Sequence, residues 1–186
     1  MKVIGITGGI ACGKSEVTSY LTSKGYVVID SDKLVNEAYQ DSDIKNKLEA
    51  SFHTLDKKSI GQVIFNDTNK KKTLENIIHP FVIEGLKKGI QTNQNQDLIF
   101  LDIPLLYESN LEYLCDKVIV VSITLDNQIK RLCKRDNIDP NYARIKIDSQ
   151  MRLKEKEKRA DYVLDNNHSL DDLYHQIDMI LKGEER

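Results

Sequence analysis

Eight residues near the start of the chain have the types and spacing of a phosphate-binding loop. The stretch Gly8-Gly9-Ile10-Ala11-Cys12-Gly13-Lys14-Ser15 fits the pattern G-x-x-x-x-G-K-[ST]. Glycines let such a loop turn its backbone N–H groups toward an anion, and a following helix adds its positive N-terminal end. Lys14 can reach the β- and γ-phosphates, and the Ser15 hydroxyl is a suitable ligand for Mg²⁺. We therefore expect a bound nucleoside triphosphate.

The alternative for this loop is a glycine-rich turn that happens to precede a lysine. An apolar run before it and a helical pattern after it favour the nucleotide. Cys12 lies near a helix N-terminus, where the pKa of a thiol can fall. No histidine or metal-binding cluster accompanies it, so we expect a small residue beside the phosphates rather than a nucleophile.

Two further stretches place carboxylates where predicted strands end. "VVIDSDKL" holds Asp30 and Asp32, and "LIFLDIPLLYES" holds Asp102. Ligands bind at this edge of an open α/β sheet, so Asp32 is a candidate to accept a proton from an attacking hydroxyl or to orient it. Helix capping by Ser31 or Asp32 is the equal alternative. Asp102 could hold Mg²⁺ directly or through water, or could cap a turn.

The segment from residue 130 to 159 is helical in pattern and strongly basic. It contains eleven Lys or Arg and five acids, in a chain whose formal net charge is −2. The alternating signs of "KEKEKR" predict a solvent-exposed helix face. Arg135 and Arg152 are the candidates to clamp phosphate oxygens, because guanidinium groups pair with them in a bidentate way. A mobile basic helix pair over the nucleotide would be a lid that excludes water.

The hydrophobic pattern predicts an α/β protein of the P-loop NTPase type. Five apolar runs are the expected strands, namely "KVIGIT", "YVVID", "DLIFLDIP", "DKVIVVSIT" and "ADYVLD". Helical stretches between them predict a five-stranded parallel sheet with helices on both faces. The first helix places Val17 and Leu21 on one face and ends at Gly25. Between Asp32 and Asp97 we expect about three helices, more than one crossover needs.

Length, composition and charge limit the classes of protein to which the chain can belong. The chain has 186 residues, 40% hydrophobic and 30% charged, which is typical of one globular core. The near-neutral charge does not suggest a nucleic-acid partner, so we expect none, and no apolar run reaches the ~20 residues that span a bilayer. Three dispersed cysteines and an opening "MKVIGITGG" without a targeting pattern predict a cytoplasmic location.

Several nucleotide-binding classes lack their own motifs here. A GTPase would need D-x-x-G after a strand and N/T-K-x-D for guanine, and an ABC-type ATPase would need its glycine-rich signature. None of these is present. A kinase is the class that the remaining residues favour. Two alternatives stay open, namely a nucleoside or nucleotide kinase of similar build and a regulatory nucleotide-binding protein.

The motifs together resemble the dephospho-coenzyme A kinase family over nearly the whole chain. The matching stretches are "IGITGGIACGKS", "VIDSDKL", "GQVIFND", "LENIIHPFV", "LDIPLLYES", "CDKVIVV", "QIKRLCKRD", "SQM" and "ADYVLDNN". The resemblance implies transfer of the γ-phosphoryl group of ATP to the ribose 3′-hydroxyl of dephospho-CoA, with Mg²⁺. It also implies one domain, with a core of 1–31, 97–126 and 160–186, a helical substrate-binding segment of 32–96 and a lid of 127–159. Either a monomer or a weak homo-oligomer is expected.

The resemblance also implies roles for single residues. Asp32 would be the base at the 3′-hydroxyl, Arg135 a lid arginine on the triphosphate, and His79 a residue of the substrate segment. Read alone, His79 would be a packed residue at a helix start. The expected nucleotide-binding residues are Gly8, Gly9, Ala11, Cys12, Gly13, Lys14, Ser15, Glu16, Arg135 and Arg152, with Ser15 and Asp102 at the metal.

The sequence departs from the usual family pattern in three places. The loop commonly reads Gly-Ser-Gly-Lys-Ser-Thr, where this chain has Ala11 at the first position and Glu16 at the last. Ala11 costs little if its φ angle is negative, and Glu16 suits the helix dipole provided that it points away from phosphate. Ile83 and Lys57 stand where the family usually has arginines.

Overall fold

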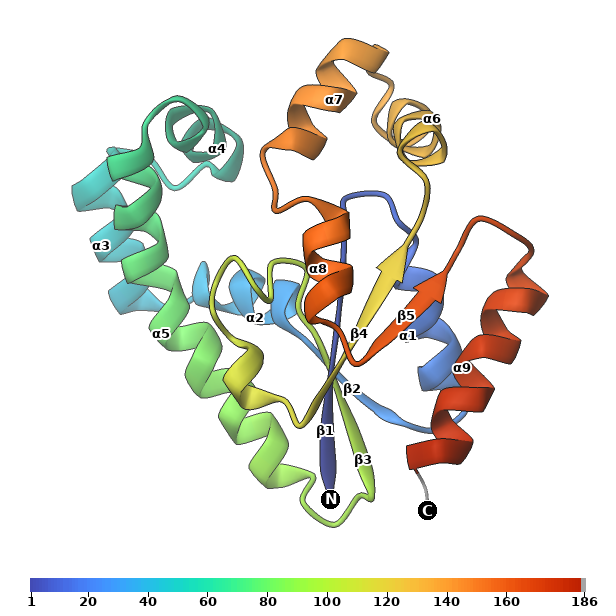
Figure 1. Cartoon of the computed structure of the whole chain (residues 1–186). Helices are drawn as coiled ribbons and strands as arrows, with labels where there is room; N and C mark the ends of the chain where they lie inside the picture. The colour runs from blue at the N-terminus through green and yellow to red at the C-terminus, as the bar shows by residue number, and fades with distance from the viewer. Residues whose placement is uncertain (185–186) are drawn as a thin grey trace. The chain divides into compact units, whose positions relative to one another are not determined.

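The computed structural model describes residues 1–184, which divide into two compact units. One unit comprises residues 1–29 and the chain from residue 93 onward, and the other comprises residues 30–92. The last two residues of the predicted 160–186 core segment lie outside the described residues. Figure 1 shows the elements of both units.

The first unit is built on a five-stranded sheet. Its strands are β1 (Lys2–Gly8), β2 (Val27–Asp30), β3 (Leu98–Asp102), β4 (Lys117–Ser122) and β5 (Tyr162–Asp165). Their order is β2-β3-β1-β4-β5, and β1 pairs in parallel with β3 and β4, as β4 does with β5. The predicted five-stranded parallel sheet is confirmed. β1 lies between β3 and β4, so the segments that follow these three strands emerge at one edge.

Both faces of the sheet are buried. On one face, side chains of β1, β3, β4 and β5 form a core with α1 (Lys14–Ser23) and α9 (Leu170–Glu184), through residues such as Ile4, Phe100 and Val121. The intervening side chains of the strands are buried too, among them Ile99 and Val120. This is why the strands read as unbroken apolar runs rather than as alternating patterns.

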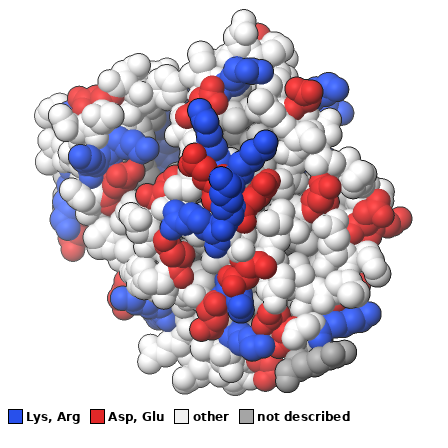
Figure 2. Space-filling model, in the orientation of Figure 1, with Lys and Arg blue, Asp and Glu red and all other residues white. Residues whose placement is uncertain are grey.

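Three helices contain the basic segment, namely α6 (Leu125–Asp136), α7 (Pro140–Asp148) and α8 (Leu153–Arg159). A short 3₁₀ turn, η1 (Glu112–Leu114), precedes β4. α8 packs against β4. In Figure 2, Lys and Arg side chains gather among acidic ones over the region where Figure 1 places α8. Lys154 and Lys158 are exposed as the alternating charges predict, but that prediction is wrong for Lys156, which is fully buried.

The second unit is helical and centres on one long helix. It contains α2 (Ser31–Ala38), α3 (Ser42–Phe52), α4 (Lys57–Asn66) and α5 (Thr68–Thr92). The expected three helical stretches are therefore four helices within the described residues. α2, α3 and α4 each pack against α5, which buries Ile78, Val82 and Leu86.

Two glycines of this unit should respond in opposite ways to replacement by alanine, because their surroundings differ. At Gly85 of α5 an added Cβ would lie 2.7 Å from Leu34 Cδ2, whereas at Gly61 of α4 nothing lies within 4 Å. Alanine gains about 1 kcal/mol over glycine inside a helix, while overpacking costs about 1–3 kcal/mol. We expect Gly61→Ala to raise the free energy of unfolding and Gly85→Ala to lower it. Urea titration of both variants tests this, and equal stabilisation by both would contradict it.

No helix among the described residues is both long enough and apolar enough to cross a membrane. The assignments of residues 32–96 to substrate binding and of 127–159 to a lid stay predictions.

Candidate active site

The phosphate loop (residues 8–15) connects β1 to α1. Gly13 has φ 91°, in the left-handed region, and a Cβ there would lie 2.1 Å from Asn166 Nδ2, so only glycine fits. Ala11 has φ 58°. A negative φ angle was the condition under which alanine would cost little here, and this condition is not met. A residue with a side chain is strained by about 1–2 kcal/mol in the left-handed region.

The loop leaves backbone donors available for an anion. Within residues 1–184, the N–H groups of Ala11, Gly13 and Ser15 have no protein acceptor. The carbonyl groups, by contrast, are occupied. Gln128 Nε2 donates to the Ile10 oxygen at 2.8 Å, and Asn166 Nδ2 donates to the Cys12 oxygen at 2.8 Å. A loop with its carbonyls held and its N–H groups open is electropositive toward its concave side.

Gln150 adds a contact of the opposite kind, because its Oε1 accepts from the Ile10 N–H at 3.0 Å. Ile10 is thus held at both backbone groups by Gln128 and Gln150, and its N–H, unlike those of Ala11, Gly13 and Ser15, already has an acceptor among the described residues. The motifs did not predict roles for Gln128, Gln150 and Asn166. All three lie in the matching stretches "QIKRLCKRD", "SQM" and "ADYVLDNN", which was the one signal available.

Lys14 forms an ion pair with Asp102, the last residue of β3. Both groups are largely buried, with side-chain exposures of 18% and 8%. The pair joins residues 88 positions apart in the chain. The sequence predicted Lys14 and Asp102 as residues of the site, but it did not predict that they contact each other. For Asp102 it offered a role at the metal or as the cap of a turn, and neither of these includes an ion pair with Lys14.

A cavity of about 390 Å³ opens over the phosphate loop. Its lining comprises Ala11, Gly13, Ser15, Glu16, Arg131, Arg135, Asn166, His168 and Leu170. Arg135 is therefore beside the loop, as expected, and its guanidinium currently pairs with Asp136 at 2.7 Å. Hydrogen bonds from Arg135 and Lys146 hold the pKa of Asp136 well below its usual value. Arg131 was not predicted as a site residue, although it belongs to the cavity wall.

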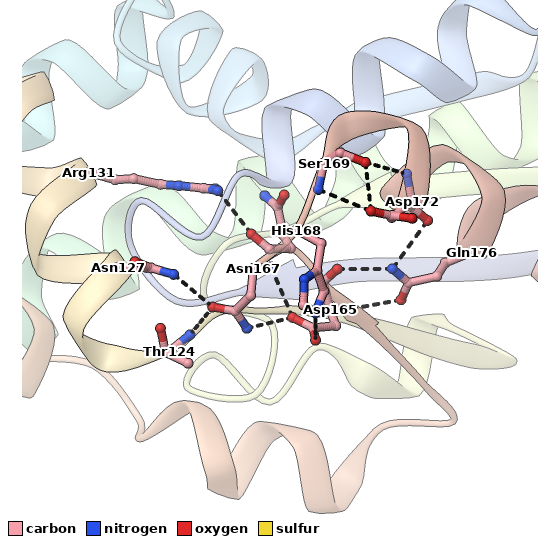
Figure 3. A network of polar contacts seen from close by, with 10 residues as sticks. Thr124, Asn127, Arg131, Asp165, Asn167, His168, Ser169, Asp172 and Gln176 are labelled. Carbon is pink, nitrogen blue, oxygen red and sulfur yellow. Dashed lines mark hydrogen bonds and ion pairs between the residues drawn. The ribbon is translucent and has the colours of Figure 1, made fainter.

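The segment after β5 is fixed to α6 by polar contacts (Figure 3). Asn167 Oδ1 accepts from Thr124 N at 2.9 Å and from Asn127 Nδ2 at 3.2 Å, and Arg131 Nη2 donates to the Asn166 oxygen at 2.9 Å. Asp165 is tied to α9 through Gln176, whose Oε1 accepts from the Asp165 N–H at 2.9 Å. These contacts make the wall of the cavity around His168 a defined surface.

Arg152 does not line the cavity over the phosphate loop. It lines a second cavity of about 370 Å³ together with Gly9, Gln128, Gln150 and Leu153 among others. The structure therefore does not bring Arg152 into the cavity that contains Arg135. Glu16 is exposed at the rim of the first cavity, which leaves its carboxylate in contact with solvent.

Asp32 is the second residue of α2, in the second unit. The N-cap of α2 is Asp30, whose Oδ1 accepts from the N–H groups of Asp32 at 2.8 Å and Lys33 at 3.3 Å. The capping alternative for Ser31 or Asp32 was therefore wrong. A carboxylate in the first turn of a helix is stabilised in its charged form by the helix dipole.

The structure also shows the surroundings of His79 and Lys57, the other residues of this unit that the sequence singled out. His79 is half-buried in the interior of α5, directly before Pro80, so the helix-start alternative was wrong. Lys57 donates to Asn36 Oδ1, and its ammonium lies 4.4 Å from the centroid of the Tyr39 ring. It is thus positioned by α2 at the beginning of α4.

The three cysteines are unpaired thiols. Cys12 is 1% exposed, and burial raises its pKa, which agrees with the expectation of a small residue rather than a nucleophile. Burial, together with the charges of Asp116 and Glu112, raises the pKa of Cys115 to about 12. Both shifts favour the neutral thiol form of Cys12 and Cys115.

We expect iodoacetamide to label Cys115 very slowly in the folded protein at pH 8. A pKa of about 12 leaves about one thiolate in 10⁴ at this pH, against about one in ten at the ordinary value of 9.0. Labelling of the urea-unfolded chain is the control, and peptide mass spectrometry measures both rates. Similar rates in the folded and unfolded chains would contradict the expectation.

The likeness to solved structures extends over the whole fold. The chain is similar to a Thermus thermophilus crystal structure, with a TM-score of 0.87, 32% identity and coverage of 98% of this chain and 97% of that one. It is also similar to shikimate kinase from Aquifex aeolicus, with a TM-score of 0.58 at 16% identity, which concerns the fold alone. The parallel sheet and the phosphate loop define a protein with the P-loop nucleotide-binding fold.

The family model for dephospho-CoA kinase matches residues 2–172. Dephospho-CoA kinase from Oceanobacillus iheyensis is 40% identical, over 97% of this chain and 96% of that one. The solved dephospho-CoA kinase from Campylobacter jejuni has a TM-score of 0.72 at 28% identity, over 98% of this chain and 97% of that one. The chain belongs to the dephospho-CoA kinase family.

Proposed function

We propose that the protein transfers the γ-phosphoryl group of ATP to the ribose 3′-hydroxyl of dephospho-CoA, forming CoA and ADP, which is the last step of coenzyme A biosynthesis. The observation that carries this proposal is the phosphate loop with open N–H groups beneath a cavity lined by Arg131 and Arg135, in a member of this family. In this proposal the triphosphate binds the loop, and the nucleoside occupies the same cavity, whose lining includes His168 and Leu170.

Charge stabilisation is the main contribution that the described site can make. Lys14 and the loop N–H groups face the β- and γ-phosphates, and Arg135 reaches the transferring group when it exchanges Asp136 for phosphate oxygens. Preorganised donors of this kind supply a large share of the rate enhancement in phosphoryl transfer. Arg152 contacts the triphosphate in this proposal only if the helices of the basic segment move, because it now lines the other cavity.

Asp32 is the proposed base at the acceptor hydroxyl, and His79 a proposed contact of dephospho-CoA. Asp32 follows the end of β2, at the edge of the sheet where ligands of open α/β folds bind. A carboxylate at this position can accept the proton of an attacking hydroxyl.

Mg²⁺ belongs to the proposal as a partner of ATP. The Ser15 hydroxyl and the Asp102 carboxylate are oxygen donors of the kind that Mg²⁺ takes, with phosphate oxygens and water completing its shell. Among residues 1–184 no group of three or more His, Cys, Asp or Glu is arranged to hold a metal. A metal held chiefly by the nucleotide suits that donor set, and when bound it neutralises charge on the β- and γ-phosphates.

An ADP-release assay tests the reaction. ATP and Mg²⁺ are supplied with dephospho-CoA, with adenosine, with AMP and with no acceptor. Turnover only with dephospho-CoA is the expected result. Turnover with adenosine or AMP alone would identify a nucleoside or nucleotide kinase, and binding of ATP without turnover on any acceptor would identify a regulatory protein. A cytoplasmic location and a monomer or weak homo-oligomer remain predictions within this proposal.

A further inference from the structure

Lys156 of α8 is a fully buried lysine whose ammonium group has three partners. Its Nζ donates to the Gly8 oxygen at 3.1 Å and to the Pro104 oxygen at 3.1 Å, and it forms an ion pair with Glu108 Oε1 at 2.8 Å. An ammonium group has three N–H donors, so each donor has an acceptor here. Its side-chain exposure is 0%.

These partners belong to two segments that carry the site. Gly8 is the last residue of β1 and the first of the phosphate loop, and Pro104 lies two residues beyond Asp102. The Pro104 oxygen also accepts from Thr7 Oγ1 at 2.9 Å. Lys156 therefore links the start of the phosphate loop to the segment whose carboxylate pairs with Lys14.

Glu108 extends the link to the beginning of α8. Its Oε1 also accepts from the Met151 N–H at 3.1 Å, two residues before α8 starts. Its Oε2, however, is buried and has no hydrogen-bond partner within residues 1–184. Burying an ion pair costs several kcal/mol of desolvation, and a half-satisfied carboxylate does not recover it fully. Apolar side chains of similar volume in place of both Lys156 and Glu108 would serve stability alone at least as well.

The charge of Lys156 also reaches the phosphate loop. Burial is the main influence on the pKa of Cys12 and raises it, while the positive charges of Lys14 and Lys156 act in the opposite direction. Lys156 is thus a second positive charge close to the loop, in addition to Lys14. Together with Gln128 and Asn166, it completes a set of side chains that hold the loop carbonyls of residues 8, 10 and 12.

We propose that Lys156 is a positioning residue for phosphoryl transfer, which keeps the phosphate loop in its anion-binding shape by holding the Gly8 carbonyl to the segment after β3. With that carbonyl fixed on the outer side, the following N–H groups face the nucleotide phosphates. Lys156 itself touches neither nucleotide nor acceptor. The inference rests on ATP as the ligand of the loop and deepens the proposed function.

The test compares Lys156→Met with Lys158→Met, an exposed lysine of the same helix. We expect Lys156→Met to weaken the binding of ATP and of inorganic pyrophosphate, measured by calorimetry, at least tenfold. We expect kcat to fall at least tenfold and KM for dephospho-CoA to stay within twofold of the wild type. The control should stay within twofold in every quantity. Pyrophosphate isolates the loop, because it binds through phosphate contacts only.

A second variant separates positioning from folding. Lys156→Met leaves Glu108 as a buried, unpaired carboxylate, whereas the double variant Lys156→Met/Glu108→Gln removes that charge and keeps an acceptor for the Met151 N–H. We expect its melting temperature to lie closer to the wild type while phosphate binding stays at least tenfold weaker. ATP binding within twofold of the wild type in either variant overturns the proposal, as does a double variant that fails to fold.

The binding measurements also separate this inference from the proposed reaction. Wild-type protein that binds ATP but phosphorylates no acceptor would defeat the proposed reaction. The ratio of phosphate affinities between Lys156→Met and Lys158→Met would still decide the role of Lys156.

Discussion

Replacing Lys14 by alanine should lower kcat with ATP and dephospho-CoA about a hundredfold or more. The ammonium group faces negative charge that grows at the transferring phosphoryl group, and loss of one such preorganised donor costs about 3 kcal/mol. An ADP-release assay under saturating substrates measures the effect.

Stability needs a separate control, because Lys14 is also the ion-pair partner of the buried Asp102 carboxylate. Removal of one partner of a buried pair is destabilising. The double variant Lys14→Ala/Asp102→Asn removes the stranded charge, and its activity should remain as low as that of Lys14→Ala. Turnover near the wild-type value in a folded Lys14 variant would exclude the loop as the place of transfer.

Asp32→Asn should slow phosphoryl transfer by about 10²–10⁴-fold, the usual contribution of a general base, with ATP affinity nearly unchanged. The amide has almost the same shape as the carboxylate but cannot accept the proton. Pre-steady-state measurement of the transfer step and calorimetric titration with ATP measure the two quantities.

The chain offers a matched control for this variant. Asp43 is the second residue of α3 and follows the N-cap Asp41, as Asp32 is the second residue of α2 and follows the N-cap Asp30. Asp43→Asn therefore removes the same helix-dipole interaction without touching the proposed base, and its turnover should match the wild type. A collapse of ATP affinity in Asp32→Asn would instead identify Asp32 as a structural or metal-binding residue.

The features that the sequence predicted well are local ones. The five strands were recognisable because each is buried on both faces and so is an uninterrupted apolar run. The phosphate loop was recognisable because its shape needs glycine at fixed positions, as the φ angle of Gly13 shows. The end of the first helix at Gly25, whose φ is 90°, follows the same logic.

The features that were missed depend on contacts between distant segments. Lys156 stands in an alternating charged run, and only the approach of Gly8 and Glu108, 148 and 48 residues away, makes its burial possible. The pairing of Lys14 with Asp102 depends in the same way on β1 lying next to β3. The prediction of the residue that caps α2 failed for a local reason. Asp30, Ser31 and Asp32 can each cap a helix, and the backbone angles decide which of the three does so.

The position of β1 in the sheet has a consequence for how the protein is made. Its two neighbours, β3 and β4, begin 90 and 109 residues after Gly8, with the whole helical unit in between. At a synthesis rate of about 5–20 residues per second, the first strand waits roughly 5–18 s on the ribosome before β3 has been synthesised. Throughout that interval an apolar segment lacks its hydrogen-bonding partners, and the loop that follows it has neither Asp102 nor the carbonyl-holding side chains. A nascent chain that ends before residue 98 should therefore have no nucleotide affinity, so ATP cannot assist folding until more than half of the polypeptide has been translated.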